Sequence, residues 1–365
     1  MNIPQRFETI SAYDQGESLE LLAARLGLTV GQIVKLDANE NPYGPSPKAV
    51  QALTDLKFPN YYPDSEGLAL RTALAGFTGA PPELLMLGSG ADELIDLLLR
   101  AVLDPGDKVL ICPPAFSMYA LDTQVNFGKI VSVNRRADFS HDVPAICRMV
   151  EQQQPKLLFI TSPNNPDGSL IDPAELDILL KLPVLVVLDE AYIEFVENAG
   201  RLGENRSRIR QVADRENLVV LRTFSKWAGL AGLRIGFGAF PPWLIPVLWK
   251  IKPPYNINIA AVAAALASLE DLDVLAERVG WIQAERRRLY EALCSIPYLQ
   301  PYPSAGNFIL CKVLGRDAAQ LQYVLADRGI LVRLFDTPAL ANSLRIGVGR
   351  SQDTDRLIEV LESEV

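Results

Sequence analysis

The sequence is poor in histidine, in clustered positive charge and in long apolar runs. His141 is the single histidine among 365 residues, which excludes a multi-histidine metal site and argues against a Ser-His-Asp triad. We expect this histidine in a solvated loop, because its surroundings, ADFSHDVP, are polar. No run reaches the roughly 18 apolar residues that suggest a membrane-spanning helix. The N-terminal stretch lacks the basic start and apolar core of a secretory signal, so we expect a cytoplasmic location.

Basic blocks and paired cysteines are also lacking. The formal net charge is -9 and the pI is near 4.9, so a nucleic acid would be repelled and local arginines would have to hold any anionic ligand. The four cysteines are widely spaced and form no CxxC pair, which argues against a zinc ribbon or a disulfide scaffold. We therefore predict no metal and buried free thiols at Cys112, Cys147, Cys294 and Cys311.

Between residues 84 and 240, short aliphatic runs alternate with helix-like stretches. This alternation predicts an α/β fold with a mostly parallel, doubly wound sheet covered on both faces. Functional residues should lie beyond the carboxyl ends of its strands. The expected strands are LLMLG, DKVLICPP, KIVSVN, KLLFITSP, VLVVLDE, NLVVLRT and RIGFGAF.

The length of the chain predicts two domains. We place an N-terminal arm at residues 1–35, a large domain at 36–260 and a small α+β domain at 261–365. In the small domain, strand-like runs alternate with helices more sparsely than in the large one.

Lys226 and Asp189 are the strongest candidates for chemistry. A partly desolvated lysine beyond a strand end is a nucleophilic amine suited to Schiff-base formation. Asp189 ends a buried strand, so its carboxylate needs a cationic or hydrogen-bonding partner, and a protonated pyridine nitrogen would be one. A lysine and an acidic residue in these roles are typical of pyridoxal phosphate sites. The alternatives are a surface lysine and an aspartate that caps the following helix.

The stretch LGSGADELIDLL is expected to bind an anion. A glycine-rich turn before a helix that starts near Ala91 and Asp92 leaves backbone N–H groups pointing at the ligand. Arg234 can add two parallel hydrogen bonds to a phosphate, with Ser225 nearby. Position 93 is Glu, so the GxGxxG fingerprint of a phosphate-binding oxidoreductase is absent.

Several other polar and aromatic residues suit a planar ring with a phenolic oxygen. Asn165 and Tyr192 can donate hydrogen bonds to that oxygen, and Phe116 can stack on the ring. The glycines at 229, 232 and 236 let the chain between Lys226 and Arg234 turn back close to the ligand.

The order and spacing of Asn165, Asp189, Tyr192, Lys226 and Arg234 resemble the fold-type I pyridoxal phosphate aminotransferases. The resemblance covers nearly the whole chain. Two departures are Phe116, where many relatives have tyrosine, and Asp167, where threonine is usual. The matching stretches are LDANENPYGPSP, NYYPDSEG, GSGADELIDLL, PPAFSMY, SPNNPDG, LDEAYIEF, TFSKWAGLAGLRIGFG, AGNFIL and LRIGVG.

The resemblance implies a role for each matching residue. It implies that Lys226 forms a Schiff base with pyridoxal 5'-phosphate and moves the proton, that Asp189 keeps the ring nitrogen protonated, and that Tyr192 is the third catalytic residue. It also implies a homodimer in which Tyr62 reaches the phosphate across the interface. The implied cofactor-binding set is Ala91, Asp92, Phe116, Asn165, Asp189, Tyr192, Thr223, Ser225, Lys226, Arg234 and Tyr62. The implied substrate-binding set is Arg345, Arg333, Asn165, Tyr13, Asn41 and Asn307.

The resemblance implies amino transfer between a phosphorylated amino substrate and a 2-oxo acid. Overall similarity favours histidinol phosphate and 2-oxoglutarate. Transamination of aromatic amino acids and decarboxylation of threonine phosphate stay open, because an arginine at position 345 can bind either a carboxylate or a phosphate. A non-catalytic regulator on this fold would usually need a DNA-binding module, for which the sequence offers no basic patch.

Overall fold

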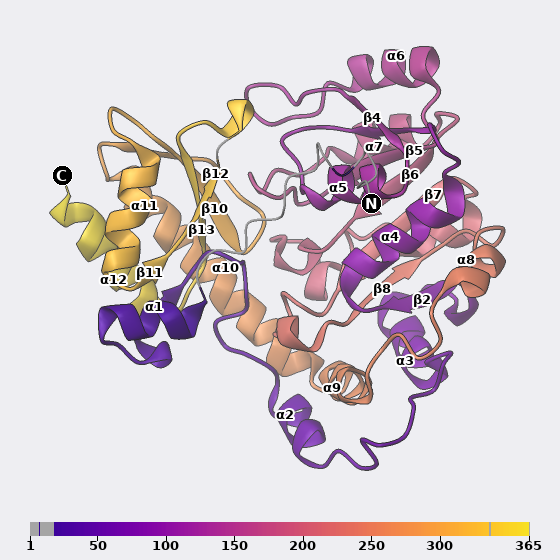
Figure 1. Cartoon of the computed structure of the whole chain (residues 1–365), viewed down its shortest axis with the longest axis horizontal. Helices are drawn as coiled ribbons and strands as arrows, with labels where there is room; N and C mark the ends of the chain where they lie inside the picture. Colours follow the sequence, from indigo (N-terminus) through magenta and orange to yellow (C-terminus); the bar gives the residue numbers. More distant parts are fainter. Residues whose placement is uncertain (1–6, 8–17, 336, 365) are drawn as a thin grey trace, which may run out of the picture.

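The computed structural model describes residue 7, residues 18–335 and residues 337–364. A larger part is built around one seven-stranded sheet, and a smaller part lies beside it with a four-stranded sheet and the C-terminal helices (Figure 1). The strands are β1 (Val34–Lys35), β2 (Leu85–Gly88), β3 (Lys108–Ile111), β4 (Lys129–Ser132), β5 (Leu157–Thr161), β6 (Leu185–Asp189), β7 (Leu218–Thr223), β8 (Gly236–Ala239), β9 (Leu299–Pro301), β10 (Phe308–Val313), β11 (Ile330–Leu331), β12 (Arg333–Phe335) and β13 (Ser343–Gly347).

The helices cover the faces of these sheets (Figure 1). The α-helices are α1 (Leu19–Leu26), α2 (Pro47–Thr54), α3 (Leu68–Thr78), α4 (Gly90–Val102), α5 (Met118–Val125), α6 (Val143–Gln153), α7 (Pro173–Leu179), α8 (Ile245–Ile251), α9 (Ile259–Leu269), α10 (Leu272–Cys294), α11 (Ala318–Asp327) and α12 (Ser351–Ser363). The 3-10 helices are η2 (Val30–Gln32), η3 (Pro82–Leu84), η4 (Ile193–Phe195), η5 (Arg201–Gly203), η6 (Ile209–Asp214), η7 (Ala231–Leu233) and η8 (Pro338–Leu340). Within the described residues, no helix is both long and apolar enough to cross a membrane.

The large sheet has the order β2-β8-β7-β6-β5-β3-β4. All seven predicted runs form strands of this sheet, and β8 alone runs antiparallel to its neighbours. The prediction of a mostly parallel α/β sheet is therefore confirmed. Its strands read as unbroken apolar runs because each face packs against helices: in β6, Val186 and Leu188 enter one hydrophobic cluster, while Leu185 and Val187 enter the other.

The small sheet has the order β12-β13-β10-β9 and is antiparallel throughout. Its partner helices are α10, α11 and α12, and β1 pairs in parallel with β11, which ties the N-terminal segment to this part of the molecule. The sheet sets Arg333 of β12 directly opposite Arg345 of β13. The sequence-based prediction of a small α+β layer is confirmed, whereas the exact boundaries at residues 35 and 260 stay predictions.

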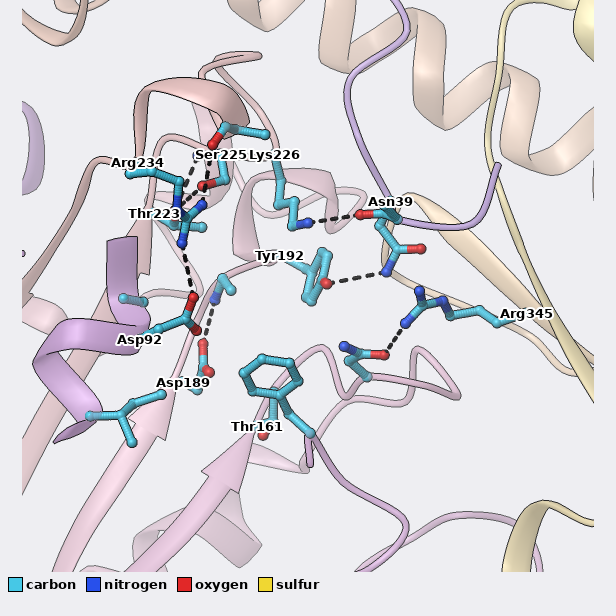
Figure 2. Close-up of a pocket in the computed structure, with 17 residues that line it drawn as sticks. Asn39, Asp92, Thr161, Asp189, Tyr192, Thr223, Ser225, Lys226, Arg234 and Arg345 are labelled. Carbon is cyan, nitrogen blue, oxygen red and sulfur yellow. Dashed lines mark hydrogen bonds and ion pairs between the residues drawn. The ribbon is translucent and has the colours of Figure 1, made fainter. Parts of the chain in front are cut away.

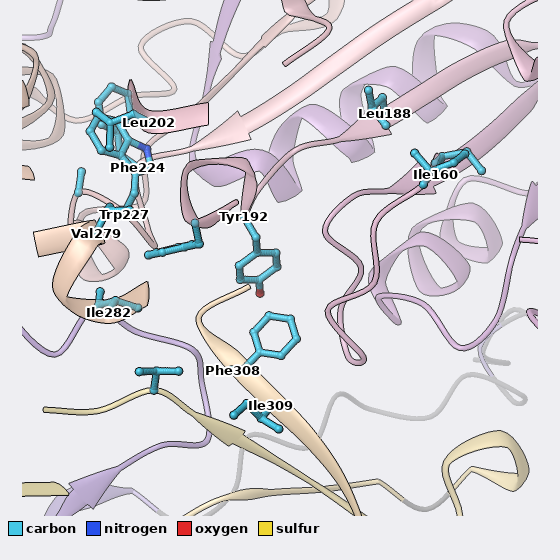
Figure 3. Packing of buried hydrophobic residues seen from close by; sticks show 14 of the residues in the cluster. Ile160, Leu188, Tyr192, Leu202, Phe224, Trp227, Val279, Ile282, Phe308 and Ile309 are labelled. Carbon is cyan, nitrogen blue, oxygen red and sulfur yellow. The ribbon is translucent and has the colours of Figure 1, made fainter. Parts of the chain in front are cut away.

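One hydrophobic cluster joins the two sheets. It includes Ile160 and Leu188 of the large sheet and Ile309 of the small one (Figure 3). At the junction, the rings of Tyr192 and Phe308 meet edge to face, with 5.0 Å between their centroids. The wall between the two parts is therefore apolar and closely packed, so the side chains that project from it have defined positions.

Two expectations about side-chain burial are wrong. His141 is buried with 1% of its surface exposed, because the segment between β4 and α6 folds back onto the protein through the buried Arg135, whose guanidinium donates to the carbonyl groups of Cys112 and Phe139. Burial and the charge of Arg135 lower the pKa of His141. Of the four cysteines predicted to be buried, Cys112 and Cys311 are buried, whereas Cys147 is half-buried and Cys294 is exposed.

Candidate active site

A cavity of about 250 Å³ opens at the carboxyl edge of the large sheet, where the small sheet faces it (Figure 2). Thr161, Asp189 and Thr223 line it, and each is the last residue of its strand. The parallel strands β5, β6 and β7 end at one edge, so they deliver these side chains to a common place. Arg345 enters from β13 on the opposite side.

The cavity gathers most of the residues predicted from the sequence. Those that line it are Ala91, Asp92, Phe116, Asn165, Asp189, Tyr192, Thr223, Ser225, Lys226, Arg234 and Arg345. Lining residues that the sequence-based prediction missed are Ala38, Asn39, Ile95, Thr161, Ala191 and Ala231. The sequence carried a signal for these residues as well. Thr161 lies in the predicted strand KLLFITSP, and the other five lie in stretches that match the family.

Among the described residues, four of the predicted ones do not line this cavity. Asn41 and Asn307 are buried nearby and donate to backbone carbonyl groups, of Trp227 at 2.8 Å and of Asn39 at 2.9 Å, so they fix the segments that border the cavity. Arg333 lies on β12 beside Arg345, and Tyr62 is 81% exposed elsewhere on the surface. Tyr13 lies outside the described residues.

Lys226 is a partly buried lysine with an unusually acidic ammonium group. Its Nζ donates to the carbonyl oxygen of Ala38 at 2.9 Å (Figure 2). Burial and, to a smaller degree, the charge of Arg345 lower the pKa of Lys226 to about 8. A neutral amine is thus accessible close to physiological pH, as a nucleophilic lysine requires.

Asp189 is a carboxylate with 5% of its surface exposed. Its Oδ2 accepts a hydrogen bond from the Tyr119 hydroxyl at 2.5 Å, and its Oδ1 accepts one from the backbone N–H of Ala191 at 2.9 Å. Burial raises the pKa of Asp189 to about 6, against the opposing effect of these two donors. The group faces the cavity as a buried acceptor suited to a cationic partner.

Hydrogen-bond donors converge at one corner of the cavity, where α4 begins. Its first turn presents backbone N–H groups near Ala91 and Asp92. The hydroxyl groups of Thr223 and Ser225 lie 2.9 Å apart, and the Arg234 guanidinium reaches Asp92 at 2.9 Å (Figure 2). This group of hydroxyls, N–H groups and one cation can bind a phosphate.

Two of the three glycines between Lys226 and this corner are required by close approach of the backbone. Gly229 has a φ of +68°, and a side chain there would meet the backbone of Gly44 at 2.5 Å. A side chain at Gly236 would meet the backbone N of Ala91 at 2.5 Å, which would block the first turn of α4. Gly232 has open space around it, so the structure gives no steric reason for that glycine.

Arg345 and Asn165 link the small sheet to the large one. The Arg345 guanidinium donates to Asn165 Oδ1 at 2.5 Å and to the backbone oxygen of Asp37 at 2.6 Å. Nearby, Tyr192 accepts a hydrogen bond from Asn39 at 3.1 Å (Figure 2). An anion-binding group and two groups suited to a ring oxygen therefore lie side by side.

The profile of the family described as aminotransferase class I and II matches residues 31–361. This chain belongs to that family. As an aminotransferase it is an enzyme that transfers amino groups, and the cationic and anionic groups around its cavity lie at the strand ends where the sequence analysis placed them.

Three similar proteins all carry the name histidinol-phosphate aminotransferase. The chain is 48% identical over 355 residues to the chloroplastic histidinol-phosphate aminotransferase of Nicotiana tabacum, covering 97% of this chain and 84% of that protein. It is 49% identical over 352 residues to the histidinol-phosphate aminotransferase of Roseiflexus castenholzii, covering 94% and 93%. A crystal structure of the histidinol-phosphate aminotransferase of Sinorhizobium meliloti in complex with pyridoxal-5'-phosphate superposes with a TM-score of 0.88 at 27% identity, covering 100% of this chain and 98% of that one.

The pKa of Lys226 yields a first prediction. Because the protonated amine does not react, acetylation of Lys226 in the ligand-free protein should accelerate as the pH rises through about 8. Replacing Arg345→Gln removes a charge that lowers this pKa, so the midpoint should move to higher pH. Competitive labelling with acetic anhydride, followed by peptide mass spectrometry with a surface lysine as internal reference, measures both midpoints. A midpoint near the ordinary 10.5 in the parent protein would contradict it.

Proposed function

We propose that this aminotransferase uses pyridoxal 5'-phosphate to convert histidinol phosphate and 2-oxoglutarate into imidazole-acetol phosphate and glutamate, a step of histidine biosynthesis. The observation that carries the substrate assignment is the identity of 48–49% to named histidinol-phosphate aminotransferases over nearly the whole chain. The paired arginines of the small sheet supply an independent physical argument.

The cavity suits the three polar parts of pyridoxal 5'-phosphate. Lys226 offers an amine to its aldehyde, Asp189 offers a buried carboxylate to its protonated ring nitrogen, and the start of α4 with Arg234 offers donors to its phosphate. When bound, the cofactor supplies an electron-withdrawing ring that weakens the bonds at the substrate's amine-bearing carbon.

Each residue around the cavity would then have a separate role. Lys226 would hold the aldehyde end of the cofactor, and its lowered pKa suits its amine to move a proton at the substrate carbon. Asp189 would keep the ring nitrogen protonated. Asn165 and Tyr192 would donate to the ring oxygen, and Phe116 would stack on the ring.

The phosphate end of the cofactor is held apart from the reacting carbon. Thr223, Ser225 and Arg234 bind it together with the first turn of α4. Because these donors come from separate segments of the large part, they would keep the ring from rotating and so hold it in place beside Lys226.

Arg333 and Arg345 bind the anionic end of the substrate. They are Cα partners on the antiparallel strands β12 and β13, and directly opposite residues project from the same face of a sheet. Two guanidinium groups match a phosphate dianion better than a single carboxylate. The arginine pair thus favours a phosphorylated substrate over an aromatic amino acid. Between the two phosphorylated candidates, the similar proteins named histidinol-phosphate aminotransferase favour histidinol phosphate over threonine phosphate.

We further propose a homodimer in which Tyr62 completes the phosphate site of the partner subunit. Tyr62 is 81% exposed and stacks on Tyr255, with 4.5 Å between the ring centroids. Its hydroxyl is therefore accessible to a partner subunit and does not line the cavity of its own subunit.

We also propose that the protein acts in the cytoplasm.

A half-reaction panel tests the substrate. Histidinol phosphate should convert the bound cofactor, seen as loss of its visible absorbance, faster than phenylalanine, tyrosine or threonine phosphate do. Lys226→Ala should abolish turnover, because no other lysine lines the cavity among the described residues. Fastest conversion by phenylalanine would overturn the substrate assignment, and full activity of Lys226→Ala would overturn the proposed mechanism.

The arginine pair makes a second prediction. Arg333→Gln should raise the KM for histidinol phosphate about ten- to hundredfold, the cost of about one hydrogen bond to a charged group, with a smaller effect on the half-reaction with glutamate. The control is Arg100→Gln, which replaces an exposed arginine on α4 that pairs with Asp96. An equal loss with both substrates would show that Arg333 does not read the phosphate.

Mixing two damaged proteins tests the dimer. Tyr62→Ala and Lys226→Ala should each turn over slowly or not at all when cofactor is limiting. A hybrid dimer has one site with both residues intact, so the mixture should be more active than the sum of its parts after subunit exchange. Activity that is merely additive would contradict a shared site.

A further inference from the structure

A buried tyrosine bonds to Asp189 from inside the protein. Tyr119 lies on α5 with 1% of its surface exposed, and its ring stacks on Phe159 of β5 with 4.4 Å between centroids and 10° between planes. An edge contact with Phe116 holds it from another side. With two aromatic neighbours, the phenol has little freedom to rotate away from the carboxylate.

The direction of the hydrogen bonds can be worked out. Tyr119 has one hydroxyl hydrogen, and the ionised Asp189 carboxylate can only accept, so that hydrogen points to Asp189 Oδ2 at 2.5 Å. The contact of 2.8 Å between Tyr119 and Thr161 must then use the hydrogen of Thr161. Thr161 and Asp189 are Cα partners on β5 and β6, so the sheet register places both ends of this short chain.

Other charges near Asp189 do not replace this bond. Asp92 raises the pKa of Asp189 through its negative charge, and burial raises it more. Glu190, the next residue, is also acidic, and Lys226 and Tyr192 line the same cavity. Within the described residues, this carboxylate accepts hydrogen bonds from the Tyr119 hydroxyl and from one backbone N–H, that of Ala191.

We propose that Tyr119 is a positioning residue that fixes the orientation of the Asp189 carboxylate and keeps it negatively charged, with Thr161 aligning the Tyr119 hydroxyl. The inference rests on the proposed function in one respect: the negative charge matters because it meets a protonated ring nitrogen. Tyr119 itself does not line the cavity, so it acts through Asp189.

The first experiment needs no cofactor. In the cofactor-free protein labelled with ¹³C at the aspartate carboxyls, the Asp189 signal is assigned by its loss in Asp189→Asn. Tyr119→Phe removes a hydrogen bond to a charged group, so the proton affinity of this carboxyl should rise about tenfold or more. An unchanged titration midpoint would overturn the proposal.

The second experiment measures cofactor affinity across pH by visible absorbance. Tyr119→Phe should weaken the binding of pyridoxal 5'-phosphate increasingly as the pH falls, approaching about tenfold below the Asp189 pKa of about 6. The effect should be smaller at higher pH, where the carboxyl is ionised in both proteins. An analogue with carbon in place of the ring nitrogen should bind the parent and the variant equally, because it has no proton for Asp189 to meet.

A matched control separates this role from a loss of stability. Tyr298→Phe also removes a buried hydroxyl, which donates to the backbone oxygen of Leu361 at 2.6 Å in the small part, and should leave the pH profile of cofactor binding unchanged. Equal weakening of both compounds by Tyr119→Phe would mean that Tyr119 only supports the pocket wall, and the proposal would fail. Binding of neither compound by the parent protein would overturn the proposed cofactor, while the carboxyl titration would still decide the role of Tyr119.

Discussion

A carboxylate taken almost fully out of water must be held by hydrogen bonds or a cation, and the site depends on how Asp189 meets that requirement. Its position follows from β6, which is apolar on both faces and therefore buried to its last residue. The Tyr119 hydroxyl and the backbone N–H of Ala191 satisfy two of its lone pairs. The same burial that makes the group costly gives its charge a strong effect on a ring placed against it.

Burial also disfavours the charged form of Lys226, but it lowers the pKa of this lysine where it raises the pKa of Asp189. Burial disfavours its ammonium form, and Arg345 adds repulsion from the small sheet. The proton affinity of Lys226 is thus set partly by a residue of the small sheet. An anionic substrate that neutralises Arg345 would weaken that repulsion, so substrate binding and the proton affinity of Lys226 are electrostatically coupled.

The sequence predicted the part of the site that follows from local pattern. Strands with two apolar faces are visible as apolar runs, and their carboxyl ends pointed to Asp189 and Thr223 before any contact was known. The burial of His141 and the bond from Tyr119 to Asp189 were missed, because each depends on contacts between segments that the polar or mixed local sequence does not encode. The pairing of Arg333 with Arg345 needed the register of β12 and β13, which no single strand specifies.

The residues that would hold the cofactor and those that would bind the substrate's anion come from different sheets, so the substrate can change while the cofactor site is kept. The groups that would hold the cofactor come from the rigid edge of the parallel sheet and the start of α4, whereas the groups that would read the substrate's anion come from β12 and β13. Replacing a residue of the small sheet alters the charge presented to the substrate without disturbing Asp189 or the first turn of α4. Because Arg345 also bonds to Asn165 at 2.5 Å, however, the separation is incomplete, and a change at position 345 should affect cofactor geometry as well as substrate choice.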